Sequence, residues 1–161
     1  MIKVNVLSEE KSWSKKIKKK EFLFNQVCKY FPKKFRFTNR LVYLTLLLSN
    51  NKKIKILNKK FRNKDKHTDV LSFPFSQKKK RSKELYLGDI IISFNYMNKP
   101  RNLTNKAFKE KTIRIFIHGF LHLLGYDHIK NTDYKKMFIN EQNIFNSLKK
   151  ILNWKKNLQQ K

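Results

Sequence analysis

Eleven consecutive residues decide how this sequence is understood: His118-Gly119-Phe120-Leu121-His122-Leu123-Leu124-Gly125-Tyr126-Asp127-His128. They contain three of the four histidines in the chain. His118 and His122 are four positions apart, so on a helix they lie on one face, about one turn apart. Two imidazoles in that relation can bind one zinc ion.

The third histidine requires the chain to turn back. A helix continued from His118 to His128 would rise about 15 Å, whereas the ligands of one zinc ion lie only a few ångströms apart. Gly125 suits that turn, because helices commonly end at a glycine in the left-handed conformation. The pattern therefore predicts two ligands on a helix, a break, and a third ligand returning toward them. Three protein ligands leave the fourth position of zinc open, as in catalytic sites.

Alternatives remain open at this site. The three histidines can be ordinary core or surface residues, although a glycine at the required turn favours the metal site. Zinc peptidases with this spacing carry Glu directly after the first histidine as the general base. This chain has Gly119 there, which disfavours peptide hydrolysis. Asp127 is a candidate base or a partner of a metal ligand, and equally a candidate for a solvent-facing turn residue.

In the rest of the chain, apolar spacing predicts a mixture of strands and helices. Strands are expected over residues 2–7, 41–48, 70–75 and 85–94, and the apolar run 41–48 is typical of a strand buried on both faces. Helices are expected over residues 22–31, 102–124 and 133–148, and a further helix after a cap at Ser49 or Asn50. In that further helix Ile54, Leu57 and Phe61 have the spacing of a buried face, and residues 9–20 are expected to be a solvated segment. The mixture indicates an α+β or α/β fold.

The totals favour one cytosolic domain over residues 1–161. A chain with 40% hydrophobic and 14% aromatic residues can bury a core. No apolar run approaches the roughly 20 residues of a membrane-spanning helix, and the N-terminus lacks the order of a secretory signal. Cys28 is the single cysteine, so no internal disulfide is expected. A basic connection over residues 78–83 and a loosely ordered basic tail from about residue 150 complete the expected organisation.

The net charge of +28 has two interpretations. Clustered lysine and arginine attract the phosphates of nucleic acid, which favours RNA as a partner. The bias toward Lys, Asn, Ile and Phe is also what an AT-rich genome produces. Charge alone therefore supports RNA binding only weakly.

Two further blocks connect the histidines to a known family. The histidine stretch matches the signature H-G-x-L-H-L-x-G-Y-D-H at every defined position. The block from Leu57 to Pro74 resembles L-N-x-x-[YF]-R-x-K-D-K-P-T-D-V-L-S-F-P, except that His67 replaces the proline, and Leu87-Gly88-Asp89-Ile90 matches L-G-D-I. Over roughly residues 40–145 the chain thus resembles the YbeY family of zinc-dependent bacterial endoribonucleases.

The resemblance implies a zincin-like α+β domain with a small mixed sheet of about four strands. It places the site for one zinc ion on the long helix and on the turn after it, with His118, His122 and His128 as ligands. It implies a single-strand-specific endoribonuclease that acts in maturation of the 3′ end of small-subunit ribosomal RNA and in ribosome quality control. Ribosomal RNA or the small ribosomal subunit is then the expected partner, and no membrane or disulfide partner is expected.

Arg62 is the expected catalytic cation. Phosphodiester cleavage needs positive charge near the transition state, and a guanidinium group grips phosphate in a bidentate way that a lysine cannot. The catalytic arginine of the family falls on this position, while a plain surface charge is the alternative. Lys64 and Lys66 are candidates for binding the RNA backbone, and His67 is expected to be an exposed loop residue.

Two other functions remain open. A basic ribosome-assembly factor with a structural metal site would bind RNA without cleaving it. A zinc hydrolase with a substrate other than RNA would share the histidine pattern.

Overall fold

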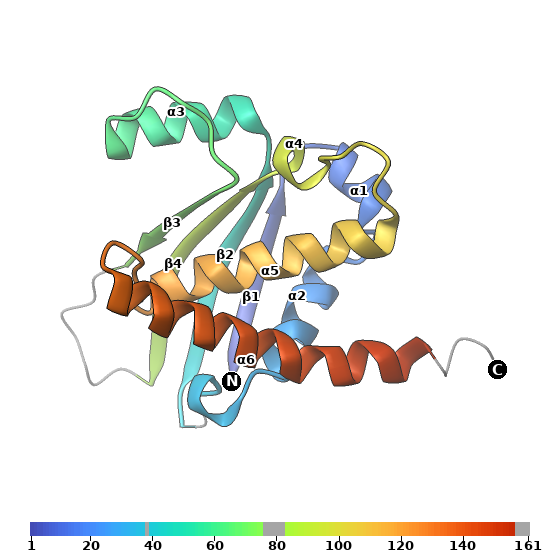
Figure 1. Ribbon diagram of the computed structural model, residues 1–161, viewed down its shortest axis with the longest axis vertical. Coiled ribbons are helices and arrows are strands. Elements are labelled where there is room, and N and C mark those ends of the chain that lie inside the picture. The colour runs from blue at the N-terminus through green and yellow to red at the C-terminus, as the bar shows by residue number, and fades with distance from the viewer. Residues whose placement is uncertain (38, 76–82, 157–161) are drawn as a thin grey trace.

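A computed structural model describes residues 1–37, 39–75 and 83–156, with side chains described up to residue 149. The elements follow in the order β1 (Ile2–Ser8), α1 (Ser12–Lys16), α2 (Lys20–Lys29), the 3-10 helix η1 (Lys33–Phe35), β2 (Leu41–Ser49), α3 (Asn51–Arg62), β3 (Val70–Pro74), β4 (Glu84–Ser93), α4 (Phe94–Met97), α5 (Asn105–Leu123) and α6 (Asn131–Lys156). Figure 1 shows α5 and α6 crossing in front of the strands. Most of the basic connection 78–83 and the last five residues of the expected tail lie outside the described residues.

The four strands form one mixed sheet in the order β1-β2-β4-β3. β1 and β4 both pair parallel with β2, and β3 pairs antiparallel with β4. The predicted α+β class with a small mixed sheet is therefore confirmed. In β2 the side chains of Val42, Leu44 and Leu46 are fully buried, while the alternate residues are only half-buried. The apolar run thus marks an interior strand whose two faces are covered unequally.

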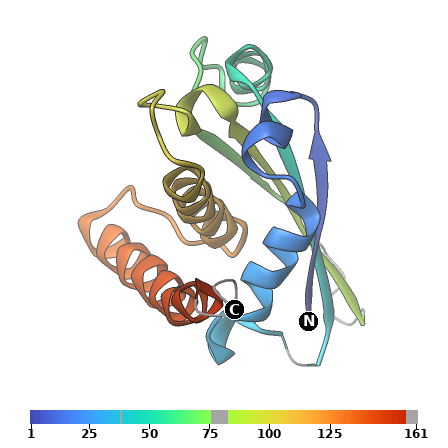
Figure 2. The same cartoon turned by 90° about the vertical axis from the view of Figure 1, so that its right-hand side faces the viewer.

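One face of the sheet is covered by helices in two layers. Ile90 and Ile92 of β4 pack into the main core together with Phe116, Ile117 and Phe120 of α5. Figure 2 shows α5 between the sheet and α6. Since α5 is covered on both sides, it needs apolar residues on more than one face, and nine of its 19 residues are buried. This position holds the histidine-bearing end of α5 between the sheet and α6.

The opposite face of the sheet is covered at one end by α3. Ile54, Leu71 and Ile91 form a second, smaller core there, with Leu57 packed against it. Asn50 caps α3, because its side chain accepts a hydrogen bond from the amide of Lys53 at 3.0 Å. The predicted cap at Ser49 or Asn50 is therefore confirmed at Asn50.

Several sequence expectations need correction. Residues 9–20 are not simply a solvated segment, because they contain α1, and Trp13 and Ile17 are buried. The indole N–H of Trp13 donates to the carbonyl of Ser49 at 3.0 Å, which ties α1 to the end of β2. The sequence pattern did not predict this helix, because two apolar residues within a run rich in lysine are too few to produce a helical period.

The predicted buried stripe of α3 is wrong at one position. Phe61 is 58% exposed, and the buried residue of that turn is Asn58. The amide group of Asn58 donates to the carbonyl of Lys66 at 2.7 Å, so this polar residue holds the loop after α3. At the far end of the chain, α6 runs to Lys156 rather than ending near residue 148.

Two further observations concern the single cysteine and the possibility of a membrane-spanning helix. Cys28 is a free, buried thiol, and burial raises its pKa. Among the described residues, no helix combines the length and the apolar character needed to cross a membrane.

Candidate metal centre

Three imidazoles meet at the end of α5. His118 and His122 lie one turn apart on the helix, and His128 returns to them from the loop before α6. One ring nitrogen of each histidine lies within 4.8 Å of the others. The structure thus brings together the three ligands expected from the sequence.

The turn that returns His128 is made at Gly125. This residue has φ +84, in the left-handed region, and a Cβ built on it would meet no atom within 4 Å. The amide of Gly125 donates to the carbonyl of His122 at 3.0 Å, and the amide of Tyr126 donates to that of Leu121 at 3.0 Å. These bonds satisfy the last carbonyls of the helix and reverse the chain. The glycine is required for its conformation rather than for space.

Hydrogen bonds fix the orientation of two of the rings. Nδ1 of His118 donates to a carboxylate oxygen of Glu141 in α6 at 2.6 Å, and Nδ1 of His122 donates to the carbonyl of Tyr126 at 2.9 Å. Carboxylate and carbonyl oxygens accept only, so in neutral rings each Nδ1 carries the proton and each Nε2 presents a lone pair. The two Nε2 atoms lie 3.0 Å apart. Two lone pairs at that distance are stabilised by a shared cation.

The electrostatic setting favours the neutral form of His122. Burial lowers the pKa of His122, and the neighbouring His118 lowers it further, against the opposing effect of the Tyr126 carbonyl. Neutral imidazole is the form that coordinates metal ions. The donor set therefore fits a divalent transition metal such as zinc, which accepts three imidazole nitrogens in a tetrahedral site.

Gly119 occupies the position where zinc peptidases carry their general base, and the structure shows why it is glycine. A Cβ at this residue would lie 2.9 Å from Cγ2 of Ile90 and 3.0 Å from Oγ of Ser72. The hydroxyl of Ser72 also donates to the carbonyl of Gly119 at 3.1 Å. Position 119 therefore faces the sheet, so a carboxylate there would point away from the histidines.

Asp127 lies beside the centre, in the exposed loop before α6. One of its carboxylate oxygens accepts a hydrogen bond from the backbone amide of His128 at 2.7 Å. Such a bond fixes the turn that presents the third ligand. This hydrogen bond therefore supports the turn interpretation of Asp127 rather than the general-base interpretation.

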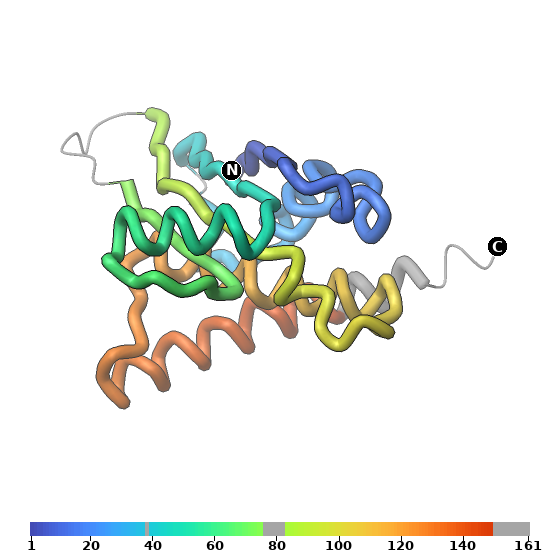
Figure 3. The backbone as a smooth tube through the Cα atoms, turned by 90° about the horizontal axis from the view of Figure 1, so that it is seen from above, coloured from blue at the N-terminus to red at the C-terminus, as the bar shows by residue number. Residues whose placement is uncertain are grey.

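Arg62, Lys64 and Lys66 come from a different element than the histidines: Arg62 is the last residue of α3, and the two lysines lie in the loop that follows. All three are exposed, and Asn63 between them adopts a left-handed conformation with φ 54. In Figures 1 and 3 the C-terminal ends of α3 and α5 lie on the same side of the molecule. In the part of the chain that the structure describes, none of the three side chains makes a hydrogen bond or ion pair with a histidine of the centre. The structure therefore does not join these cations to the imidazoles by direct contact.

His67 follows in the same loop, where the family pattern has proline. It is exposed, as expected, and Nδ1 lies 3.0 Å from the hydroxyl of Tyr96. It is not part of the histidine centre.

Glu141 is the residue that sequence reasoning missed. It stands 23 positions after His118, on a different helix, and only the packing of α6 against α5 brings the two together. The need for a group that orients the imidazole was predictable, because metal-binding histidines usually donate their second N–H to a carboxylate or carbonyl. No local pattern singles Glu141 out from the 11 acidic residues of the chain.

Comparison with known proteins gives a consistent result. The model of the family "Endoribonuclease YbeY" matches residues 6–149. A curated relative of that name from Pelagibacter ubique is 57% identical over 149 residues, which cover 92% of this chain and 97% of that protein. Another, from Persephonella marina, is 38% identical over 109 residues, which cover 67% of this chain and 71% of that protein.

A solved structure resembles the whole fold. It is the solution structure of TM1509 from Thermotoga maritima, with 25% sequence identity and a TM-score of 0.50. The match covers 98% of this chain and 93% of that one. The likeness therefore extends over the helical layers as well as the sheet.

Proposed function

Since the chain belongs to the YbeY family of endoribonucleases, we propose that it is a zinc-dependent, single-strand-specific endoribonuclease. Its substrate is ribosomal RNA, at the 3′ end of the small-subunit molecule and in ribosome quality control, and it acts in the cytoplasm. Residues 1–161 act as one domain. The small ribosomal subunit is the partner that presents the RNA.

The observation that supports this proposal most strongly is the meeting of three imidazole nitrogens within 4.8 Å. His118, His122 and His128 would hold one zinc ion. When bound, zinc supplies positive charge to a phosphoryl oxygen or lowers the pKa of a coordinated water toward neutrality. Glu141 and the Tyr126 carbonyl fix the tautomers of His118 and His122, which keeps both Nε2 atoms available.

The cations at the end of α3 and in the loop after it would supply the second half of the site. Arg62 would grip the phosphate and stabilise the charge that develops on it during cleavage, as a planar guanidinium group does best. Lys64 and Lys66 would neutralise neighbouring phosphates of the strand. Asp127 would serve as a base or as the residue that fixes the turn, and its bond to the His128 amide supports the second role.

Cleavage of a single-stranded RNA tests the proposal. The protein is compared with His118→Ala and Arg62→Ala, and the zinc content of each preparation is measured. We expect His118→Ala to lose both zinc and cleavage, and Arg62→Ala to keep zinc but lose cleavage. Arg101→Ala removes an exposed arginine from the turn before α5 and is the matched control, expected to cleave normally.

Three outcomes would contradict the proposal. Cleavage by zinc-free His118→Ala, after contaminating nuclease is excluded, would show that the centre is not catalytic. RNA binding without cleavage by the zinc-loaded protein would indicate a binding factor with a structural metal. Cleavage of peptides but not RNA would indicate a different hydrolase.

A further inference from the structure

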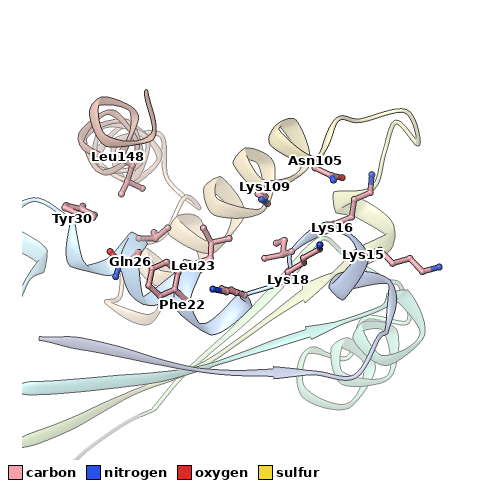
Figure 4. Close-up of a pocket in the computed structure, with 13 residues that line it drawn as sticks. Lys15, Lys16, Lys18, Phe22, Leu23, Gln26, Tyr30, Asn105, Lys109 and Leu148 are labelled. Carbon is pink, nitrogen blue, oxygen red and sulfur yellow. The ribbon is translucent and has the colours of Figure 1, made fainter. Parts of the chain in front are cut away.

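A second basic site lies away from the histidines, in a groove between α1, α2, the start of α5 and α6. The groove has a volume of about 570 Å³. Figure 4 shows its two halves: Phe22, Leu23 and Tyr30 lie along α2 near Leu148 of α6, and the lysines gather toward α1 and α5. The groove thus offers an apolar wall and a cationic wall to one ligand.

The charge of the groove is of one sign. Five lysines are among the described residues that line it, and no aspartate or glutamate is. Lys16 is committed to the fold, because its ammonium group donates to the carbonyl of Leu103 at 3.2 Å. Lys15, Lys18, Lys19 and Lys109 are exposed, and their ammonium groups make no hydrogen bond or ion pair with any described residue. A polyanion would therefore meet four lysines that lose no existing partner.

The apolar wall narrows the class of polyanion. Phe22 is 58% exposed, a large fraction for an aromatic side chain, and Tyr30 is half-buried beside the groove. Aromatic rings bind the unpaired bases of single-stranded nucleic acid by stacking, while lysines neutralise its phosphates. A helix made of acidic and apolar residues would also match this chemistry. The RNA substrate of the proposed function already supplies both bases and phosphates, which favours RNA.

The groove and the histidine centre lie on opposite faces of α5. Lys109 and His118 are nine residues apart, which on an α-helix corresponds to about 900° of rotation, or half a turn, and to about 13 Å along the axis. One nucleotide cannot touch both places. An RNA strand that contacts both the groove and the histidine centre must pass around the helical layer.

We propose that this groove is a second binding site for single-stranded RNA, which holds a part of the substrate remote from the cleaved phosphate. The inference rests on the proposed function for the identity of the ligand. Its consequence is a preference for long substrates. A short oligonucleotide reaches the histidine centre only, whereas a long strand is held at two places.

The test compares two variants of equal charge. The groove variant replaces Lys15, Lys18, Lys19 and Lys109 by Gln. The control variant replaces four exposed lysines outside the groove by Gln, at positions 3, 29, 33 and 52, and both variants reduce the net charge from +28 by 4 to +24. Binding is measured by fluorescence anisotropy at several salt concentrations, and cleavage by kcat/KM, with 5-nucleotide and 30-nucleotide single-stranded RNA.

We expect the groove variant to bind and cleave the 30-nucleotide RNA at least about tenfold less well, with the 5-nucleotide RNA unaffected. Each lost phosphate contact lowers the slope of log affinity against log salt by about 0.7. The control variant should change both substrates by less than about threefold. Phe22→Ala and Phe22→Leu should each weaken binding of the long RNA by about fivefold or more, because leucine keeps the apolar volume but not the aromatic face.

Several results would overturn the inference. Equal losses in the groove and control variants would show that only total charge matters. Equal losses on short and long RNA would place the effect at the histidine centre. Undiminished RNA binding, with loss of binding to a labelled peptide of Glu and Leu, would assign the groove to a protein partner. Anisotropy with an uncleaved RNA tests the groove even if the protein cleaves nothing, so failure of the proposed function remains a separate outcome.

Discussion

The two ends of α5 differ in how their polar side chains are held. At the C-terminal end, His118 and His122 are half-buried, and a hydrogen bond to Glu141 or to the Tyr126 carbonyl fixes each ring. At the N-terminal end, Lys109 is exposed beside an open groove and has no partner among the described residues. The same helix thus carries histidines with fixed ring orientations at one end and an exposed lysine at the other.

This difference corresponds to what each task needs. Metal coordination requires ligand atoms within a few tenths of an ångström of their ideal positions, so the rings must be oriented before the ion binds. Attraction of a phosphate backbone is long-range and sequence-independent, so flexible lysines suffice. The contrast predicts that substitutions at the two ends of α5 have separable effects.

The largest effect is expected at the metal end. His118→Ala should reduce zinc affinity by more than about 100-fold, because losing a ligand costs more than losing the group that orients it. The affinity for a 30-nucleotide RNA should fall far less, because the groove remains. Competition with a chromogenic chelator measures the first quantity, and anisotropy measures the second. A variant that kept its zinc affinity would show that His118 is not a metal ligand.

A smaller effect at the same end is expected from Glu141→Gln. The amide still accepts a hydrogen bond from His118 but carries no charge, so zinc affinity or activity should fall by about 10- to 100-fold. Thermal unfolding of the metal-free protein should change little. Glu110→Gln removes a carboxylate of α5 that pairs with Lys106, and it should leave zinc affinity unchanged. An equal loss in both variants would mean that general charge, not ring orientation, controls the metal.

The packing of α5 against the sheet predicts a third difference between its two ends. Gly119→Ala should destabilise the fold by about 1–3 kcal/mol, because its Cβ would press on Ile90 and Ser72. Lys109→Ala, on the exposed end of the same helix, should change stability by less than about 0.5 kcal/mol. Urea unfolding of the metal-free variants measures both. Equal stability of the two variants would show that the sheet yields to the added methyl group.

The smallest effect is expected at the turn. Gly125→Ala meets no steric contact but must hold φ near +84, which costs about 1–2 kcal/mol for a residue with a side chain. Gly125→Asn should recover part of that loss, because asparagine tolerates the left-handed region. Urea unfolding again provides the measurement. Two variants with identical stability would show that conformation is not what the glycine supplies.

The sequence predicted the metal end better than the rest of the molecule. The spacing of His118, His122 and His128, with Gly125 between the last two, was enough to predict that three imidazoles meet across a turn. The strands were predicted with small errors at their ends, because alternating or continuous apolar runs are local signals. The family membership predicted from three motifs agrees with the comparisons over residues 6–149.

The errors share one cause. Trp13 anchors α1 against the carbonyl of Ser49, and Glu141 orients His118 from another helix, so each interaction joins residues far apart in the chain. Phe61 has the spacing of a buried residue, yet α3 covers only one end of the sheet and leaves it 58% exposed. Periodicity specifies which face of a helix is apolar, but not how far the surface it packs against extends.

The sequence alone therefore predicted the group of three histidines and the turn that brings them together, because both depend on neighbours within eleven residues. Three features became visible only in the tertiary structure. Glu141 orients the ring of His118, Gly119 lies close to the sheet, and the groove lies on the face of α5 opposite the histidines. Those features arise where separate elements pack together. Packing depends on the shapes of whole surfaces, which no short run of residues encodes.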